Sequence, residues 1–284
     1  MKKLDLDVEE IIRMYTVEEK TLGEIGRILG VSYGTVKHRL VTNNIPVRNR
    51  KECKALRDRT YPCIGNGRKH FMNFDYFKTW SRNMAYILGF LSADGYIGKD
   101  NSFFRIALQE GDINILEKIK EEIEYTGEIK KTKHKVNGKE FPTATLIVSS
   151  KYVASDLIKI GIENNKSFTT NMDKVPDEYR LDFIRGYFDG DGTVGEQWTK
   201  RSKIPMLRVR ICSGSEKMLI QIVEHLEKLG VKRVKIHKNP RRNLYDIAYS
   251  QNASKQIYKL FYEDESLICL DRKKEKFKDI LRRQ

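Results

Sequence analysis

Long apolar segments and targeting signals are missing from this sequence. No apolar run reaches the length of a transmembrane helix, and no apolar segment follows the Met-Lys-Lys start as it would in a secretory signal. The sequence also shows neither a lipidation signal nor an amphipathic basic helix. These absences exclude an integral membrane protein. We expect a soluble intracellular protein, in the cytoplasm or nucleoid of a host that the sequence does not identify.

Cysteine is scarce and unpatterned. The four cysteines are Cys53, Cys63, Cys212 and Cys269, and none forms a Cys-x-x-Cys motif, so we predict no disulfide in a reducing compartment. Cys53 and Cys63 lie near His70 and imitate a zinc loop, but the fourth ligand and the ligand spacing of such a site are missing. The role of these two cysteines stays open.

Acidic residues are too few to balance the basic ones. The 284 residues include 54 Lys and Arg against 39 Asp and Glu, which gives a net charge of +15 at pH 7. Hydrophobic residues make up 39% of the chain, enough for globular folding, so this is not a disordered polycation. A folded protein this basic usually binds a polyanion, first of all nucleic acid and second an anionic membrane surface. The length suggests two domains.

Residues 5–45 have the pattern of three short helices. Apolar residues at helical spacing predict the first helix from Val8. Thr21 is expected to cap a second helix that ends at Gly30, and Ser32 is expected to cap the third. This arrangement is typical of a helix-turn-helix DNA-binding domain, with a small helical interaction domain as the alternative. In the DNA-binding interpretation the third helix presents Ser32, Tyr33, Thr35, Lys37 and His38.

We place this domain at residues 1–48 and a basic linker at residues 49–80. Basic residues, among them Arg48 and Arg50, outnumber acidic ones across the boundary, and Gly65-Asn66-Gly67 marks a flexible point. Such a linker could follow the phosphate backbone between two DNA-binding modules. A solvated tether without contacts is the alternative.

The rest of the chain is organised around two matching stretches, residues 87–95 and 184–192. Each is a helical run that ends in a small residue, an aspartate and a glycine. Small residues lie four apart in both, which places them on one helix face and lets two helix backbones approach closely. We therefore predict that the two helices pack against each other through Gly89, Ala93, Gly186 and Gly190.

The aspartates of the two stretches are predicted to form a metal site. Gly95 and Gly192 fit the left-handed residue that follows a helix, which leaves Asp94 and Asp191 at the negative ends of their helix dipoles. Two carboxylates facing each other there would be unfavourable unless a cation lies between them. A divalent metal with oxygen ligands is the natural candidate. A pair of Asp-Gly turns without function is the alternative, which two copies in matching context disfavour.

The flanking segments repeat in the same way. The patterns predict an α+β fold in which helix, two strands, helix, two strands, helix (αββαββα) occurs twice about a pseudo-twofold axis, in halves at residues 81–175 and 176–284. Alternation on the strands would place one sheet face on the core and the other toward the DNA major groove. The basic residues expected on the DNA-facing side are Arg105, Lys131, Lys133, Lys135, Arg208, Arg210, Lys235, His237, Arg241 and Arg242.

The doubled motif resembles that of single-chain LAGLIDADG homing endonucleases, over roughly residue 81 to the C-terminus. The resemblance places the family's acidic metal ligands at Asp94 and Asp191, next to Gly95 and Gly192. Ser92 departs from the family, which has an acidic residue there, but that position is not the metal ligand.

The resemblance also implies an activity and further site residues. It implies hydrolysis of one phosphodiester per strand across the minor groove of a long asymmetric DNA target, leaving short 3′ overhangs. The cofactor would be Mg²⁺, which Ca²⁺ or Mn²⁺ can replace in crystals. Lys166 and Lys273, after the last helix of each half, match the basic residue that the family places near its metals. Gln109 is a weaker match to a polar residue that orders water, because its second-half counterpart, Cys212 or Ser213, is ambiguous.

Two other functions stay open. The chain could be a DNA-binding transcription regulator that kept the fold and lost the chemistry, although both aspartates and both lysines are present. It could also be an RNA maturase that assists splicing of its host intron. Splicing segments that would indicate an intein are not seen around the repeats. We expect a monomer; the target sequence, the host element and the persistence of cleavage do not follow from the sequence.

Overall fold

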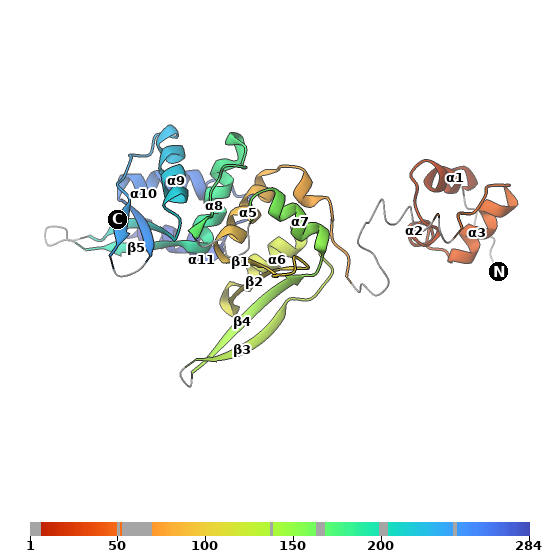
Figure 1. Cartoon of the computed structure of the whole chain (residues 1–284), viewed down its shortest axis with the longest axis horizontal. Coiled ribbons are helices and arrows are strands. Elements are labelled where there is room, and N and C mark those ends of the chain that lie inside the picture. Colours follow the sequence, from red (N-terminus) through yellow and green to blue (C-terminus); the bar gives the residue numbers. More distant parts are fainter. Residues whose placement is uncertain are drawn as a thin grey trace. The chain divides into compact units, whose positions relative to one another are not determined.

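The computed structural model (Figure 1) divides the chain into two compact units, Met1–Arg68 and Lys69–Gln284. It describes residues 7–49, 52, 70–136, 139–162, 168–198, 204–240 and 243–284. Within these ranges, none of the helices combines the length and the apolar character needed to span a membrane.

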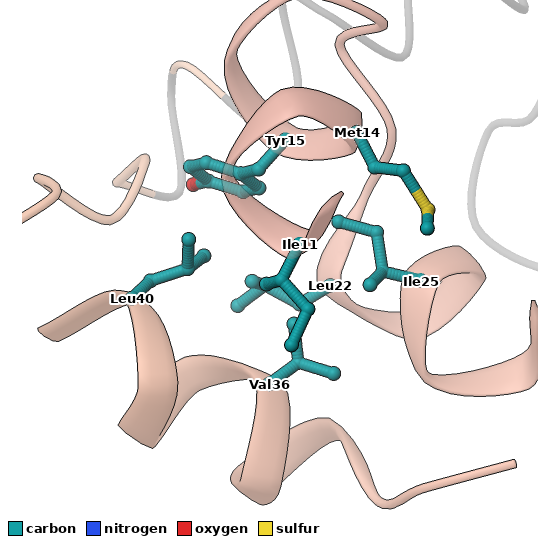
Figure 2. Packing of buried hydrophobic residues seen from close by; sticks show 7 residues of the cluster. All are labelled: Ile11, Met14, Tyr15, Leu22, Ile25, Val36 and Leu40. Carbon is teal, nitrogen blue, oxygen red and sulfur yellow. The ribbon is translucent and has the colours of Figure 1, made fainter. Parts of the chain in front are cut away.

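The first unit contains the three predicted helices, α1 (Val8–Thr16), α2 (Leu22–Ile28) and α3 (Tyr33–Thr42). Asp7 caps α1 and Ser32 caps α3, since their side chains accept hydrogen bonds from backbone N–H groups of the first turn. Gly30 has a φ of +65° in the tight turn before α3, a conformation that glycine adopts without strain. Figure 2 shows the small core that the three helices share, built from Ile11, Met14, Tyr15, Leu22, Ile25, Val36 and Leu40.

Arg48 belongs to this unit as a structural residue, and the structure does not support its predicted role in DNA binding. Its guanidinium lies 4.0 Å from the ring centroid of Tyr15 and donates hydrogen bonds to the carbonyls of Tyr15 and Lys20. Its backbone N–H donates to the Tyr15 hydroxyl at 2.7 Å. These contacts fasten the end of the domain onto α1.

Replacing Arg48 by alanine should therefore loosen the first unit. Hydrogen bonds from a charged donor contribute about 1.5–3 kcal/mol each, so the loss is large for so small a core. Hydrogen–deuterium exchange of peptides covering residues 8–42 in the full chain should accelerate in Arg48→Ala. The matched variant Lys37→Ala, which removes an exposed cation from the same unit, should leave exchange unchanged. Equal exchange in both variants would contradict this role of Arg48.

The second unit has two halves with the same element order, which confirms the predicted αββαββα duplication. The first half contains α5 (Arg82–Asp94), β1 (Gly95–Ile97), β2 (Phe104–Gln109), α6 (Ile113–Glu122), β3 (Lys130–Val136), β4 (Lys139–Val148) and α7 (Lys151–Lys159). The second contains α8 (Arg180–Asp191), β5 (Gly192–Gln197), β6 (Met206–Ser213), α9 (Glu216–Lys228), β7 (His237–Asn239), β8 (Leu244–Ser250) and α10 (Asn252–Tyr262). A further helix that the sequence analysis did not predict, α11 (Asp271–Arg282), ends the chain.

Each half has one antiparallel sheet, with strand order β1-β2-β4-β3 in the first and β5-β6-β8-β7 in the second. Short 3₁₀ turns precede or follow several elements: η1 (Tyr76–Lys78), η2 (Glu110–Asp112) and η4 (Asp177–Tyr179). Alternate residues of the central strands are buried, for example Phe104 and Ile106 in β2 and Val209 and Ile211 in β6. One face of each sheet therefore lies on the core, as the period-two pattern predicted.

Residues 70–80, predicted as the end of a linker, pack on the second unit instead. The Asn73 N–H donates to the Ile123 carbonyl at 2.9 Å. Phe77 is buried and meets the Phe104 ring edge-on, with centroids 6.2 Å apart. Trp80 stacks on Tyr179, each just before its motif helix, at a centroid distance of 5.8 Å. The segment packs there because its side chains are largely apolar. The basic composition of residues 49–80 as a whole concealed this in the sequence.

Candidate active site

Helices α5 and α8 pack against each other through glycines. Any larger residue at these positions would push the two helices apart. A Cβ added to Gly89 would stand 2.0 Å from the Phe183 carbonyl oxygen, and one added to Gly186 would stand 1.9 Å from the Tyr86 carbonyl oxygen. The two contacts are related by the pseudo-twofold symmetry of the halves. Side-chain atoms cannot occupy such positions, so the helix backbones are in direct contact.

The two helices stay in close contact up to their C-terminal ends. A Cβ on Gly190 would lie 2.3 Å from the Ala93 Cβ and 3.3 Å from Oδ2 of Asp94. The carboxylate of α5 therefore stands beside the last turn of α8, where Asp191 is the final residue. Asp94 and Asp191 are both exposed. The structure thus brings the two predicted metal ligands to one place on the surface.

Gly95 and Gly192 are not left-handed caps, contrary to the prediction. Their φ values are −79° and −85°, in the extended region, and each begins a strand directly after its helix. The chain turns back so closely that a Cβ on Gly95 would lie 2.5 Å from the Leu91 carbonyl oxygen, and one on Gly192 would lie 2.1 Å from the Phe188 ring. Close approach, and not backbone handedness, is what requires glycine here.

The oxygen donors at this point suit a hard divalent cation. Both carboxylates stand at helix C-termini, where the partial negative charge of the backbone adds to their own. A cleft of about 410 Å³ opens beside Asp191 and is lined by Ala93, Tyr187 and Ser213, among others. The Tyr187 hydroxyl lies 2.9 Å from the Ser213 hydroxyl. Burial, together with the nearby Asp191 carboxylate, raises the pKa of Tyr187, so this phenol stays neutral.

Lys273 lies in the first turn of α11 and is buried against the end of α8. Its Nζ donates hydrogen bonds to the carbonyls of Phe188, Asp189 and Gly190, at 2.6, 2.7 and 3.3 Å. An ammonium group has three donors, and here all three satisfy backbone groups at the negative end of the helix that carries Asp191. Burial lowers the pKa of Lys273 to about 8, while the carboxylates of Asp189, Asp94 and Asp191 act in the opposite direction.

The remaining predicted catalytic residues differ in position. Lys166 lies outside the described residues. Gln109 is exposed at the end of β2. Ile106 and Ile211 occupy equivalent positions, because each pairs with the glycine after its motif helix. Counting on from them, the counterpart of Gln109 is Gly214, which carries no side chain, and not Cys212 or Ser213.

The sheet register separates the predicted basic residues into two groups. Paired residues on neighbouring strands point to the same face. Arg105 pairs with Tyr96, and in the second half Arg210 pairs with Thr193 and shares the outward face with Arg208 and His237. Lys235 is exposed just before β7, whereas Arg241 and Arg242, like Arg50, Cys53 and Cys63, lie outside the described residues.

Lys131, Lys133 and Lys135 lie on the opposite face of their sheet from Arg105, which corrects the prediction. Lys131 pairs with the buried Ala144, so the three lysines share the core-side face of β3. They are exposed because the β3–β4 hairpin extends beyond the helices of its half (Figure 1). Each also has an acidic neighbour, Glu110 for Lys131 and Glu140 for the other two, at 3.1 to 3.7 Å.

In the first unit, α3 exposes most of its predicted DNA-reading residues. Tyr33, Lys37 and His38 are exposed, whereas Val36 and Leu40 of the same helix lie in the core. The remaining two hydroxyls, of Ser32 and Thr35, lie 2.8 Å apart and take part in the helix cap. The arrangement suits a helix that presents its outer face to a partner.

Comparison with known protein families decides the identity of the second half. Residues 178–280 match the family described as "LAGLIDADG-like domain". This half is a LAGLIDADG-like domain. The first half repeats its element order and sheet topology, so the second unit has the two-motif LAGLIDADG fold. Residues 1–42 match the family described as "Sigma-70, region 4".

The chain is also similar to solved structures. No curated protein matches the chain. The meganuclease I-SmaMI, bound to uncleaved DNA in the presence of calcium ions, is 12% identical with a TM-score of 0.48 and covers 72% of this chain and 90% of its own. The homing endonuclease I-WcaI, bound to its DNA recognition sequence, is 16% identical with a TM-score of 0.47, over 70% and 90% of the two chains. I-LtrWI, a LAGLIDADG homing endonuclease bound to target DNA, is 13% identical with a TM-score of 0.45, over 74% and 89%.

The LAGLIDADG-like domain contains one polar cluster that sequence reasoning missed. Asp189 is buried in α8 and accepts hydrogen bonds from the hydroxyls of Tyr86 and Tyr262 and from the Leu270 N–H, the first and last at 2.7 and 2.8 Å. Burial raises the pKa of this carboxyl against the effect of its partners. The first copy has Ser92 at this position, and its hydroxyl donates to the Leu88 carbonyl of its own helix. The acidic residue of the second motif thus joins α5, α10 and the start of α11.

Proposed function

We propose that this chain is a site-specific double-strand DNA endonuclease that depends on a divalent metal. The observation that carries the proposal is the convergence of Asp94 and Asp191 at the ends of two helices in backbone contact. Two exposed carboxylates that converge at the negative ends of two helices attract a cation strongly. Binding of Mg²⁺ beside a DNA phosphate is the purpose that the family resemblance and the net charge of +15 support together.

Asp94 and Asp191 would hold the metal, with the backbone at Gly95 and Gly192 beside them. When bound, a divalent metal activates water and stabilises the leaving oxygen of a phosphodiester. Both carboxylates are exposed, so a metal bound by them would be accessible to DNA at the surface. Lys273 neutralises the end of α8 and brings one positive charge close to the place where negative charge develops. Lys166, Gln109 and a cut of each strand across the minor groove, with short 3′ overhangs, complete the proposal by resemblance.

Double-stranded DNA is the proposed substrate, read by outward-facing residues of both sheets and by α3. Arg105, Arg208, Arg210 and His237 provide the major-groove contacts in this proposal. Since the halves differ in sequence, one chain would read a non-palindromic target. The domains proposed are the helix-turn-helix at residues 1–48 and the two LAGLIDADG halves.

A selection experiment tests the proposal and finds the target at the same time. Random double-stranded DNA is selected for binding to the full chain, and the enriched sequence is placed in a plasmid. We expect linearisation in Mg²⁺ and none in EDTA. Specific binding without cleavage in any divalent metal would instead identify the regulator of the same fold. Binding confined to folded intron RNA would identify a maturase.

Removing residues 1–48 should shorten the target without abolishing the chemistry. Two linked modules gain effective concentration when both reach their sites, so the full chain should bind more tightly than the second unit alone. Footprinting should show lost protection on one side of the site only, and the truncated chain should still cut in Mg²⁺. An unchanged footprint would contradict DNA reading by α3 and favour a protein-binding role for these helices.

A further inference from the structure

The segment that joins α10 to α11 leaves its own half and crosses the first one. Asp264 forms an ion pair with Arg82 of α5 at 2.7 Å. Further on, the Lys118 Nζ of α6 donates to the Asp271 carboxylate at 2.7 and 2.8 Å and to the Cys269 carbonyl at 3.3 Å. The contacts of this segment with the first half are polar and directional, so they fix the path of the chain there.

Arg272 makes the most specific of these contacts. Its guanidinium donates two hydrogen bonds to the Asp112 carboxylate, at 2.8 and 2.9 Å. Asp112 is 8% exposed and lies in η2, directly after β2 of the first half. A bidentate arginine–carboxylate pair fixes both distance and orientation. The pair therefore connects the turn after β2 in one half to the first turn of α11 in the other.

The next residue of α11 is Lys273. Two residues just before it in the sequence are anchored. The Leu270 N–H donates to the buried Asp189, and Arg272 pairs with Asp112. Directly after these two anchors the Lys273 side chain, 5% exposed, reaches the carbonyls of Phe188, Asp189 and Gly190 in the last turn of α8. The two anchors come from different halves of the molecule.

We propose that Asp112 and Arg272 are positioning residues whose ion pair holds Lys273 against the end of α8, beside Asp191. The consequence for cleavage rests on the proposed endonuclease function, whereas the consequence for Lys273 itself does not. Without the pair, the first turn of α11 loses its bidentate contact with the first half and keeps the contact between Asp271 and Lys118. The ammonium group of Lys273 then shifts away from the carbonyls. A misplacement of catalytic groups by about 1 Å can cost on the order of a hundredfold in rate.

Four variants of the full chain separate this role from others. Arg272→Gln and Asp112→Asn each break the pair from one end. Arg272→Lys keeps the positive charge, so it should retain part of the wild-type protection of Lys273. Arg282→Gln is the matched control, because it removes an exposed arginine that pairs with Asp279 on the same helix, at 3.4 Å. Melting temperatures are measured for all four. Should Asp112→Asn fail to fold, Arg272→Gln still carries the test, because its side chain is 61% exposed.

Two readouts are compared. The first is acylation of Lys273 by a lysine-reactive ester, quantified by mass spectrometry on folded protein. We expect it to rise several-fold in Arg272→Gln and Asp112→Asn and to stay at the wild-type level in Arg282→Gln. The second is single-turnover cleavage of the selected DNA, which should slow by roughly tenfold or more in both variants at unchanged DNA affinity. Because Lys273 serves one of two asymmetric halves, nicked plasmid should accumulate before linear product.

Two results would overturn the proposal, and a third would separate it from the proposed function. Continued protection of Lys273 in Arg272→Gln and Asp112→Asn would do so, even if the wild type cuts no DNA. Weaker DNA binding by Arg272→Gln, with Asp112→Asn unaffected, would make Arg272 a DNA contact instead. If the wild type cuts nothing in any metal but Lys273 becomes reactive in both variants, the positioning role stands and only the proposed function fails.

Discussion

Replacing Gly186 by leucine should abolish DNA cleavage out of proportion to its effect on stability. The added Cβ would begin 1.9 Å from the Tyr86 carbonyl oxygen, so α5 and α8 must separate before the rest of the side chain finds room. Overpacking a tight contact costs roughly 1–3 kcal/mol or more. Separation also moves Asp94 away from Asp191, and about 1 Å of displacement can cost on the order of a hundredfold in rate.

The control for this variant is the same substitution at Gly161. That glycine follows α7 with a φ of +114°, and the nearest described atoms to an added Cβ belong to the Lys174 side chain, at 3.8 Å. A leucine there strains the backbone and should lower the melting temperature without a selective loss of cleavage. Melting temperature and single-turnover cleavage are measured for both variants. A folded Gly186→Leu protein that cuts at the wild-type rate would disprove the proposed site.

Asp94→Asn and Asp191→Asn should each eliminate double-strand cleavage and leave specific DNA binding nearly intact. The amide keeps the shape of the side chain but is a far poorer metal ligand, and neither aspartate is placed to read bases. Both side chains are exposed, so the substitutions should not unfold the protein.

Asp279→Asn provides the matched control for these two variants. Asp279 lies on α11 with 62% of its side chain exposed and pairs with the neighbouring Arg282 at the surface. Its cleavage rate and DNA affinity should equal those of the wild type. Full double-strand cleavage by either Asp94→Asn or Asp191→Asn would remove that residue from the metal site.

The duplicated fold and the helix interface could be predicted because their signals are local and repeated. Small residues at Gly89 and Gly186 have one consistent explanation when they recur in matching context, and the strands between them alternate with period two. The structure confirms the αββαββα order in both halves. The same repetition pointed to Asp94 and Asp191, which the fold brings together although they are 97 residues apart in sequence.

Other features depend on long-range packing and could not be predicted. Alternation shows that Lys131, Lys133 and Lys135 share a face, but not which one, because the hairpin extends past the core and both faces are polar there. Lys273 was expected near the site, yet its burial depends on α11 and on Asp112 in the other half. The glycines after the motif helices illustrate a further limit, since Asp-Gly fits both a left-handed cap and a close backbone approach.

The most direct test of the central claim is a count of bound metal ions. Manganese(II) bound by the complex of the chain with its cut DNA product can be measured by electron paramagnetic resonance in the wild type and in Asp94→Asn, Asp191→Asn and Asp279→Asn. If the two motif aspartates hold the metal together, the wild type and Asp279→Asn bind manganese equally, and each of the other two variants loses bound metal. Equal manganese binding by all four proteins would show that the paired aspartates are not a metal site.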